Sequence, residues 1–239
     1  MAKTELLYLD DSYLKEFKAT VQSVSDGKYI VLDKTAFYPQ GGGQPFDTGI
    51  LCFETTEYTV VFAKKLPDGT VSHEVDKPGL QPGDSVTGII DWERRYQHMR
   101  IHTAMHVLSS VFHNETGALI SGNQIDLEKS RIDFTLENFD REKIKQYADH
   151  ANALIKKNKP LKVYSMKRDN ALKIPAVVKL AGALPPNSDV LRIVEIEDID
   201  LQADGGTHVR NTSEVGEIDI LSCENKGKNN RRVYFKLKM

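Results

Sequence analysis

Frequent turn sequences divide the first 90 residues of the chain into short segments that favour β-strands. Residues 17–24 alternate between apolar and polar side chains, and Asp26-Gly27 is a typical hairpin turn before the apolar segment 28–32. Further turn sequences containing glycine or proline lie at 47–49, 67–69, 77–79 and 81–84. Short strands at this spacing are typical of a small barrel. We therefore predict a β-barrel-like module at residues 1–90.

The pattern changes at Asp91-Trp92. Residues 94–113 contain neither glycine nor proline and predict a helix. A second helix is predicted from Asp140, a good N-cap residue, to about residue 157. Alternating segments that predict further strands lie at 130–136, 190–196, 217–221 and 233–237. We predict an α+β fold in which residues 91–239 form a second domain, with helices packed on an antiparallel sheet.

Composition excludes several classes of protein. Of the 239 residues, 40% are hydrophobic and 28% are charged, which is ordinary for a globular protein and argues against a disordered or fibrous one. No apolar run of about 18 residues occurs, so we expect no membrane-spanning helix. The first ten residues include acidic side chains where a signal peptide would be apolar. With only two cysteines, Cys52 and Cys223, we expect a reduced, cytoplasmic setting.

The charges balance over the whole chain but not locally. The formal net charge is −2, which argues against a protein covered with nucleic acid. However, residues 225–239 contain six basic residues and no acidic one, and residues 156–173 contain seven basic residues opposed only by Asp169. Each stretch is either a solvated face or a basic patch suited to a phosphate backbone. The sequence leaves both interpretations open.

His102-Thr-Ala-Met-His106 is the strongest local signal for chemistry. On the predicted helix, the two imidazoles lie one turn apart on the same face and can bind one metal ion together. A metalloprotease would carry glutamate directly after the first histidine, where this chain has Thr103. On its own, the spacing is also that of ordinary surface or capping histidines.

Asp204-Gly-Gly-Thr-His208 adds a carboxylate and an imidazole joined by a flexible loop. Alone, this segment is also a common turn. Combined with His102 and His106, it gives three nitrogens and one oxygen, which is enough for a tetrahedral zinc site or for three ligands and an open water position. Cys223 is an alternative to Asp204 as fourth ligand, although we favour a packing role for it.

Phe37-Tyr-Pro-Gln-Gly-Gly-Gly-Gln44 would allow the backbone to approach a bulky partner closely. It matches neither the dinucleotide-binding glycine pattern nor a P-loop. From the spacing alone, a sharp turn is the better explanation.

These motifs belong to a longer series with a fixed order. The series comprises Phe37–Gln44 with Asp47–Gly49, Asp91–Arg95, His102–His106, Arg131–Phe134, Gly205–Val209 with Thr212 and Glu214–Gly216, and Asn230–Val233. Together they resemble the freestanding alanyl-tRNA editing proteins, relatives of the editing region of alanyl-tRNA synthetase. The order of the glycine-rich and histidine segments is similar to that of the medium-length members.

The resemblance implies a fold, a reaction and a cofactor. Proteins of this family hydrolyse Ser-tRNA(Ala), and often Gly-tRNA(Ala), in trans and use a zinc site. One Zn²⁺ per chain would be held by His102, His106 and His208, with Asp204 where the family usually has cysteine. A carboxylate there would give a harder site, more tolerant of other divalent ions. His102, His106 and Thr103 are our catalytic candidates.

The partner implied by the resemblance is the acceptor end of tRNA(Ala). We expect Asn123 and Gln124 to lie near the aminoacyl group and to favour serine through hydrogen bonds. We expect Gly41, Gly42 and Gly43 with Arg94 and Arg95 to contact the acceptor stem. The chain is expected to be a monomer or a weak dimer. The alternative is a tRNA- or RNA-binding module in which zinc is purely structural.

Overall fold

The computed structural model describes residues 2–137, 140–177, 179, 181 and 188–238. The chain divides into two compact units, residues 1–97 and residues 98–239. Both are rich in antiparallel strands, and helices occur with them, so the predicted α+β class is confirmed. No helix in the described part of the chain has the length and apolar character needed to cross a membrane.

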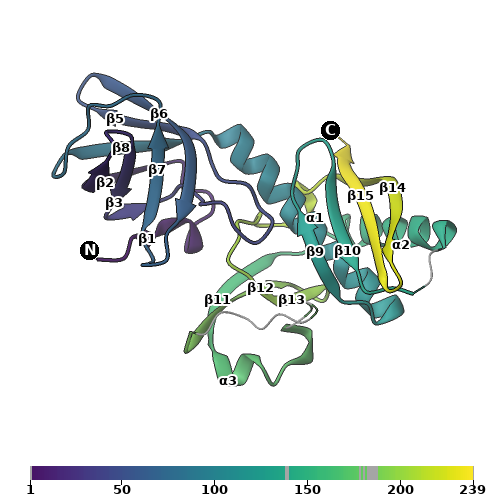
Figure 1. Cartoon of the computed structure of the whole chain (residues 1–239). Helices are drawn as coiled ribbons and strands as arrows, with labels where there is room; N and C mark the ends of the chain where they lie inside the picture. The colour runs from purple at the N-terminus through teal and green to yellow at the C-terminus, as the bar shows by residue number, and fades with distance from the viewer. Residues whose placement is uncertain (1, 138–139, 178, 180, 182–187, 239) are drawn as a thin grey trace. The chain divides into compact units, whose positions relative to one another are not determined.

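The first unit is built around a closed six-stranded barrel (Figure 1). Its strands, in barrel order, are β2 (Glu16–Ser25), β3 (Tyr29–Leu32), β7 (Val71–Val75), β6 (Thr56–Lys65), β5 (Gly49–Phe53) and β8 (Ser85–Ile90). β2 alternates between exposed and buried residues as predicted, and its inward side chains Phe17, Ala19 and Val21 enter the barrel core. Two short strands, β1 (Glu5–Leu6) and β4 (Lys34–Thr35), pair in parallel, and a 3-10 helix, η1 (Leu7–Leu9), follows β1. The barrel-like architecture follows directly from this alternation.

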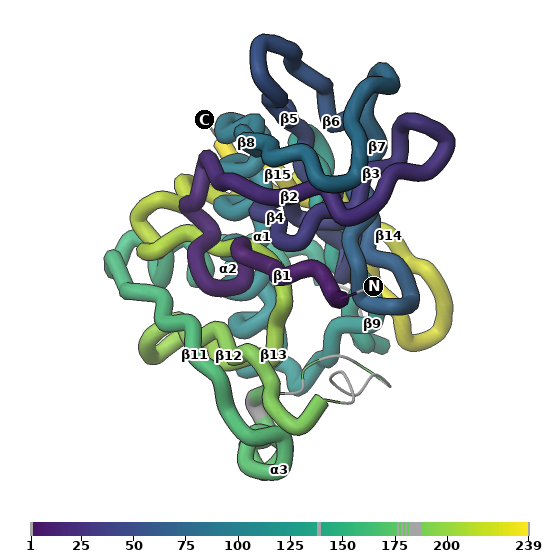
Figure 2. The backbone as a smooth tube through the Cα atoms, turned by 90° about the vertical axis from the view of Figure 1, so that its left-hand side faces the viewer, coloured from purple at the N-terminus to yellow at the C-terminus, as the bar shows by residue number. Residues whose placement is uncertain are grey.

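The second unit contains two antiparallel sheets. The four-stranded sheet has the order β14 (Glu217–Gly227), β15 (Asn230–Lys238), β10 (Ser130–Phe134) and β9 (Ile120–Gln124). The three-stranded sheet has the order β11 (Leu161–Lys167), β12 (Val190–Ile196) and β13 (Asp200–Ala203). Figure 2 shows β11, β12 and β13 side by side, with the short helix α3 (Arg168–Ala171) beyond β11. The 3-10 helices are η2 (Pro175–Val177) and η3 (Thr212–Glu214).

Two long helices cover these sheets. α2 (Arg141–Ile155) begins where predicted, because the Asp140 side chain accepts hydrogen bonds from the backbone N–H groups of Glu142 and Lys143. It packs against β14.

α1 (Trp92–Thr116) contacts both sheets of the second unit. The Phe112 ring stacks on Phe134 of β10 at 4.2 Å between centroids. On the other side, Ser110 donates a hydrogen bond of 2.5 Å to the backbone oxygen of Ile199, just before β13. Every residue from Ile101 to Phe112 is buried. The histidine face of this helix therefore lies inside the protein.

Candidate metal centre

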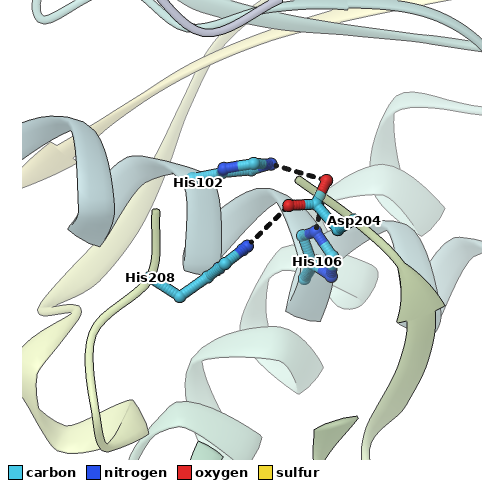
Figure 3. Close-up of side chains that lie close together, drawn as sticks. All are labelled: His102, His106, Asp204 and His208. Atoms are coloured by element: carbon cyan, nitrogen blue, oxygen red, sulfur yellow. Dashed lines mark hydrogen bonds and ion pairs between the residues drawn. The ribbon is translucent and has the colours of Figure 1, made fainter. Parts of the chain in front are cut away.

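Three histidines and one aspartate meet beside α1 (Figure 3). His102 and His106 project from successive turns of the helix, as their spacing predicts. Asp204 directly follows β13, and His208 lies four residues further along the same loop. One donor atom from each of the four residues lies within 4.8 Å of the others. Segments about a hundred residues apart in sequence thus present four potential metal ligands to one point.

The Asp204 carboxylate lies among the three imidazoles. Its Oδ1 is 3.1 Å from His208 Nε2, and its Oδ2 is 3.5 Å from His102 Nε2 and 3.9 Å from His106 Nε2. A tetrahedral zinc ion with bonds of about 2.0–2.2 Å separates neighbouring donor atoms by about 3.3–3.6 Å. The distances from the carboxylate to the imidazoles, 3.1–3.9 Å, span these values, and the four donor atoms lie within 4.8 Å of one another. Three nitrogens with one carboxylate oxygen form a normal zinc donor set, so the chemistry of the four residues fits a zinc ion.

The other ring nitrogens are held by hydrogen bonds. His106 Nδ1 lies 2.8 Å from Oδ2 of Asp200, and His208 Nδ1 lies 3.2 Å from the Thr103 hydroxyl. The His102 ring bonds to the backbone of Thr207. Metal-binding histidines usually have such an outer partner, which fixes the ring and the position of its proton. The three Nε2 atoms are thereby left to face one another.

Burial and charge prepare the site for a cation. Burial lowers the pKa of His102 to about 4 and holds that of His208 well below its ordinary value, so both rings are neutral near pH 7. Burial opposes charge on His106 as well, but hydrogen bonds with Asp200 and Asp204 outweigh it and raise the pKa of His106 to about 9. For Asp204, burial favours the neutral acid, yet the three histidines hold its pKa well below the usual value. The site therefore offers an ionised carboxylate and at least two neutral imidazoles.

Access from solvent is uneven around the four side chains. The Asp204 side chain is 22% exposed, whereas that of His208 is 2% exposed. Of the four side chains, that of Asp204 is consequently the one that solvent reaches most easily.

Cys223 lies elsewhere in the second unit. It belongs to β14 and pairs with Val233 of β15. It also lines a cavity of about 480 Å³ between β14 and α2. Burial raises the pKa of its thiol to about 11, so it remains protonated near pH 7. Asp204, and not Cys223, stands among the three imidazoles in the described part of the chain.

Thr103 lies beside the cluster of potential ligands. It is fully buried, and its hydroxyl bonds to His208 Nδ1 and accepts a hydrogen bond from the backbone N–H of Val209. These contacts orient the His208 ring, and a catalytic role for Thr103 stays a prediction.

Arg95 is enclosed in the first unit. Its guanidinium is fully buried and forms an ion pair with the fully buried Asp47. It also donates to the backbone oxygens of Ser12 and Ala36, at 3.0 and 2.5 Å. These bonds give the residue a structural role, and its contact with the acceptor stem stays a prediction.

The other predicted substrate-binding residues of the first unit are more accessible. Gly41, Gly42 and Gly43 are exposed in a tight turn, closed by hydrogen bonds between the backbones of Gly41 and Gln44. Gly42 and Gly43 have φ values of 58° and 86°, which glycine adopts without strain. Arg94 is half-buried and donates to the backbone oxygen of Phe46. The segment Gly41–Gly43 is thus both a sharp turn and an exposed stretch of backbone.

Asn123 and Gln124 lie on β9, the edge strand of the four-stranded sheet. Gln124 is exposed and accepts a hydrogen bond from Arg131. Asn123 is half-buried and pairs with Ile132 of β10. Their proximity to an aminoacyl group remains a prediction.

The basic stretch at 225–239 is engaged within the protein to a large extent. Lys226 pairs with Glu224, Arg232 with Asp133, and Lys238 with Glu217, while Arg231 is buried and donates to backbone oxygens. Because most of these basic side chains already have partners within the protein, the contacts favour the interpretation of this stretch as a solvated face.

Sequence reasoning missed the residues that support His106. Asp200 accepts from His106 and forms a buried ion pair with Lys179. Asp200 and Gln202 alternate along β13, and this period of two could have indicated that they share a face. No comparable pattern identifies Lys179, because it lies outside the regular elements.

Comparison with known proteins defines the class. Residues 191–234 match the family described as the threonyl and alanyl tRNA synthetase second additional domain. Residues 3–94 match the family described as class II (A) tRNA synthetases. The unit that carries the metal centre is therefore of the kind found as an additional domain in these synthetases.

Individual relatives narrow the class further. The chain is 48% identical over 98% of its length to the alanyl-tRNA editing protein AlaX-M of Methanosarcina barkeri, and it covers 99% of that protein. The same values hold for AlaX-M of Saccharolobus solfataricus. The alanine–tRNA ligase of Saccharolobus islandicus is 38% identical over 92% of this chain, which covers 25% of that ligase. The chain belongs to the AlaX-M family of alanyl-tRNA editing proteins, as the motif series predicts.

Proposed function

We propose that this protein is a trans-acting hydrolase that removes serine from mischarged tRNA(Ala), and so protects the fidelity of translation; glycine on the same tRNA is the second substrate to be tested. Two findings support this: the membership in the AlaX-M family and the meeting of His102, His106, His208 and Asp204. The observation that carries the proposal is the partly exposed carboxylate beside three buried imidazoles. Such a site binds a cation and remains open to a substrate.

The proposed cofactor is one Zn²⁺ per chain, held by the three imidazoles. When bound, zinc would lower the pKa of a hydrolytic water or hold the terminal adenosine and its ester. Asp204 is either the fourth ligand or the acceptor of a hydrogen bond from the attacking water. Because the ester is already activated, a positioned water and a stabilised oxyanion are sufficient for hydrolysis.

The remaining residues would bind and select the substrate. Asn123 and Gln124 are proposed to hydrogen-bond the serine hydroxyl, since a lost hydrogen bond discriminates between substrates better than size alone. The exposed Gly41–Gly43 turn and Arg94 are proposed to contact the acceptor stem of tRNA(Ala). Thr103 would act indirectly, by holding His208.

A deacylation assay tests the proposal. We expect the protein to hydrolyse Ser-tRNA(Ala) but to leave Ala-tRNA(Ala) and Ser-tRNA(Ser) intact, and Gly-tRNA(Ala) in the same assay decides whether glycine is removed as well. Removal of the metal with a chelator, or the substitution His106→Ala, should reduce the rate at least about 100-fold, because several kcal/mol of stabilisation depend on the metal. Added zinc should restore the chelated wild type but not the variant.

The same assay separates hydrolysis from a purely structural zinc. In that alternative, the protein would bind tRNA(Ala) without deacylating any of the four substrates. Rapid loss of Ser-tRNA(Ser) would contradict the proposed selection for tRNA(Ala).

A further inference from the structure

β13 and the residue that directly follows it supply two carboxylates to the same histidine. Successive strand residues point to opposite sides, so Asp200 and Gln202 share a face of β13. Both are buried, whereas the residue between them is half-buried. Asp200 lies 2.8 Å from His106 Nδ1, and Asp204, just after the strand, lies 3.9 Å from His106 Nε2. The two nitrogens of the imidazole therefore each face one carboxylate.

The Asp200 carboxylate is fixed by three donors. Its Oδ2 accepts from His106 Nδ1 and from Gln202 Nε2, each at 2.8 Å, and its Oδ1 pairs with Lys179 Nζ. The Asp200 side chain is fully buried, so these donors are satisfied within the protein. The carboxylate cannot rotate away from His106 without leaving buried donors unpaired, which is costly.

Lys179 is an unusual residue to find at this place. Its side chain is 4% exposed, and a buried ammonium requires a charged partner. Its backbone is anchored as well, because the N–H of Ile120 in β9 donates to the backbone oxygen of Lys179 at 2.8 Å. The ammonium is thus held against Asp200 from a fixed position.

We propose that Asp200, held by Lys179 and Gln202, is a positioning residue that fixes His106 with a proton on Nδ1, so that Nε2 is the nitrogen that faces the metal site. An ionised carboxylate only accepts hydrogen bonds, so the nitrogen that faces it carries the proton. Outer carboxylates of this kind orient a histidine ligand and make it more basic. The inference rests on the proposed function in taking His106 as a zinc ligand.

The substitution Asp200→Asn tests the proposal. Asparagine has nearly the same shape, but it replaces one acceptor oxygen with an N–H₂ group and faces three donors. Zinc affinity is measured by competition with a chromogenic chelator, and site geometry by the visible absorption of the Co²⁺-substituted protein. We expect zinc binding to weaken about 10- to 100-fold and the Co²⁺ spectrum to change.

Two further comparisons define the role of each partner. Asp198→Asn neutralises an exposed carboxylate two residues away, and it should leave zinc affinity unchanged. Lys179→Met should weaken zinc binding in the same direction as Asp200→Asn, whereas Lys179→Arg, which keeps the charge, should restore most of the affinity.

The outcome that overturns the inference is zinc affinity and a Co²⁺ spectrum in Asp200→Asn equal to those of the wild type. Thermal unfolding of the metal-free proteins separates this role from simple loss of the fold: a variant that unfolds like the wild type but binds zinc weakly supports positioning. If Asp200→Asn and Asp198→Asn both bind zinc weakly and both unfold at an equally lowered temperature, the inference is contradicted. Failure of the proposed function is distinguishable, because the wild type itself would then fail to bind zinc or to deacylate Ser-tRNA(Ala).

Discussion

His73, in the barrel of the first unit, is a buried imidazole that does not belong to the four-residue cluster of the candidate metal centre. Its Nδ1 lies 3.0 Å from the backbone oxygen of Ile30, and its Nε2 lies 2.8 Å from the Thr35 hydroxyl. The Thr35 hydroxyl in turn accepts from the backbone N–H of Phe37. A neutral ring satisfies all these groups, with Nδ1 as donor and Nε2 as acceptor. Burial therefore lowers the pKa of His73 to about 4.

This pKa predicts acid sensitivity. Between pH 6.5 and about 4, the unfolded chain binds a proton at His73 that the folded chain does not bind. The free energy of unfolding therefore falls as the pH drops through this range, by up to roughly 3 kcal/mol from this residue. Urea unfolding at several pH values should show a steeper loss for the wild type than for His73→Asn. Parallel curves for the two proteins would contradict the expectation.

The residues also show how far sequence reasoning reaches. His102 and His106 were predicted from a spacing that any helix converts into proximity. The ion pair of Arg95 had no sequence signal, because its partner Asp47 lies 48 residues earlier and meets it only in the folded unit. Lys179 was missed for the same reason, since its contact with Asp200 depends on tertiary structure.

At the scale of elements, α1 contacts several other elements of the second unit. Its buried length contacts β10 through Phe112 and approaches β13 through Ser110. The Phe112 ring also lies 5.1 Å from that of Tyr147 in α2. Three elements therefore depend on one fully buried side chain.

Phe112→Ala should accordingly destabilise the protein by about 3–5 kcal/mol, because it leaves a cavity among stacked rings. Phe112→Leu keeps most of the apolar volume and should cost less than half as much. Chemical unfolding followed by circular dichroism measures both. Equal, small losses for the two variants would show that the ring packing contributes little.

Periodicity predicted most elements but not their neighbours. The alternation in residues 130–136 and 233–237 indicates two strands, and β10 and β15 are present there. Their pairing, Ile132 opposite Val233, joins segments about a hundred residues apart and has no local signal. For the same reason, the side on which β13 faces α1 could not be predicted.

At the scale of the whole molecule, the proposed substrate is large enough to contact both units. Gly41 is the suitable position for a test in the first unit. It is exposed, and an added Cβ would have no atom closer than 3.9 Å. A larger side chain therefore fits there without strain in the fold.

Gly41→Glu should raise the KM for Ser-tRNA(Ala) about tenfold, because a carboxylate repels the phosphate backbone. Gly41→Gln adds the same bulk without the charge and should change KM much less. Zinc content should stay the same in both variants. An unchanged KM in Gly41→Glu would remove this turn from the proposed tRNA interface.

The hairpin loop between β12 and β13 consists of residues 197–199, with Asp198 in the left-handed conformation. Strand side chains have only two orientations, so an insertion of one residue in this loop that shifted the register of β13 would turn Asp200 and Asp204 outward together. The three-stranded sheet would keep its backbone pairing, but the histidines on α1 would lose both acidic partners at once. The register of β13 is therefore a single determinant of both acidic partners of the centre.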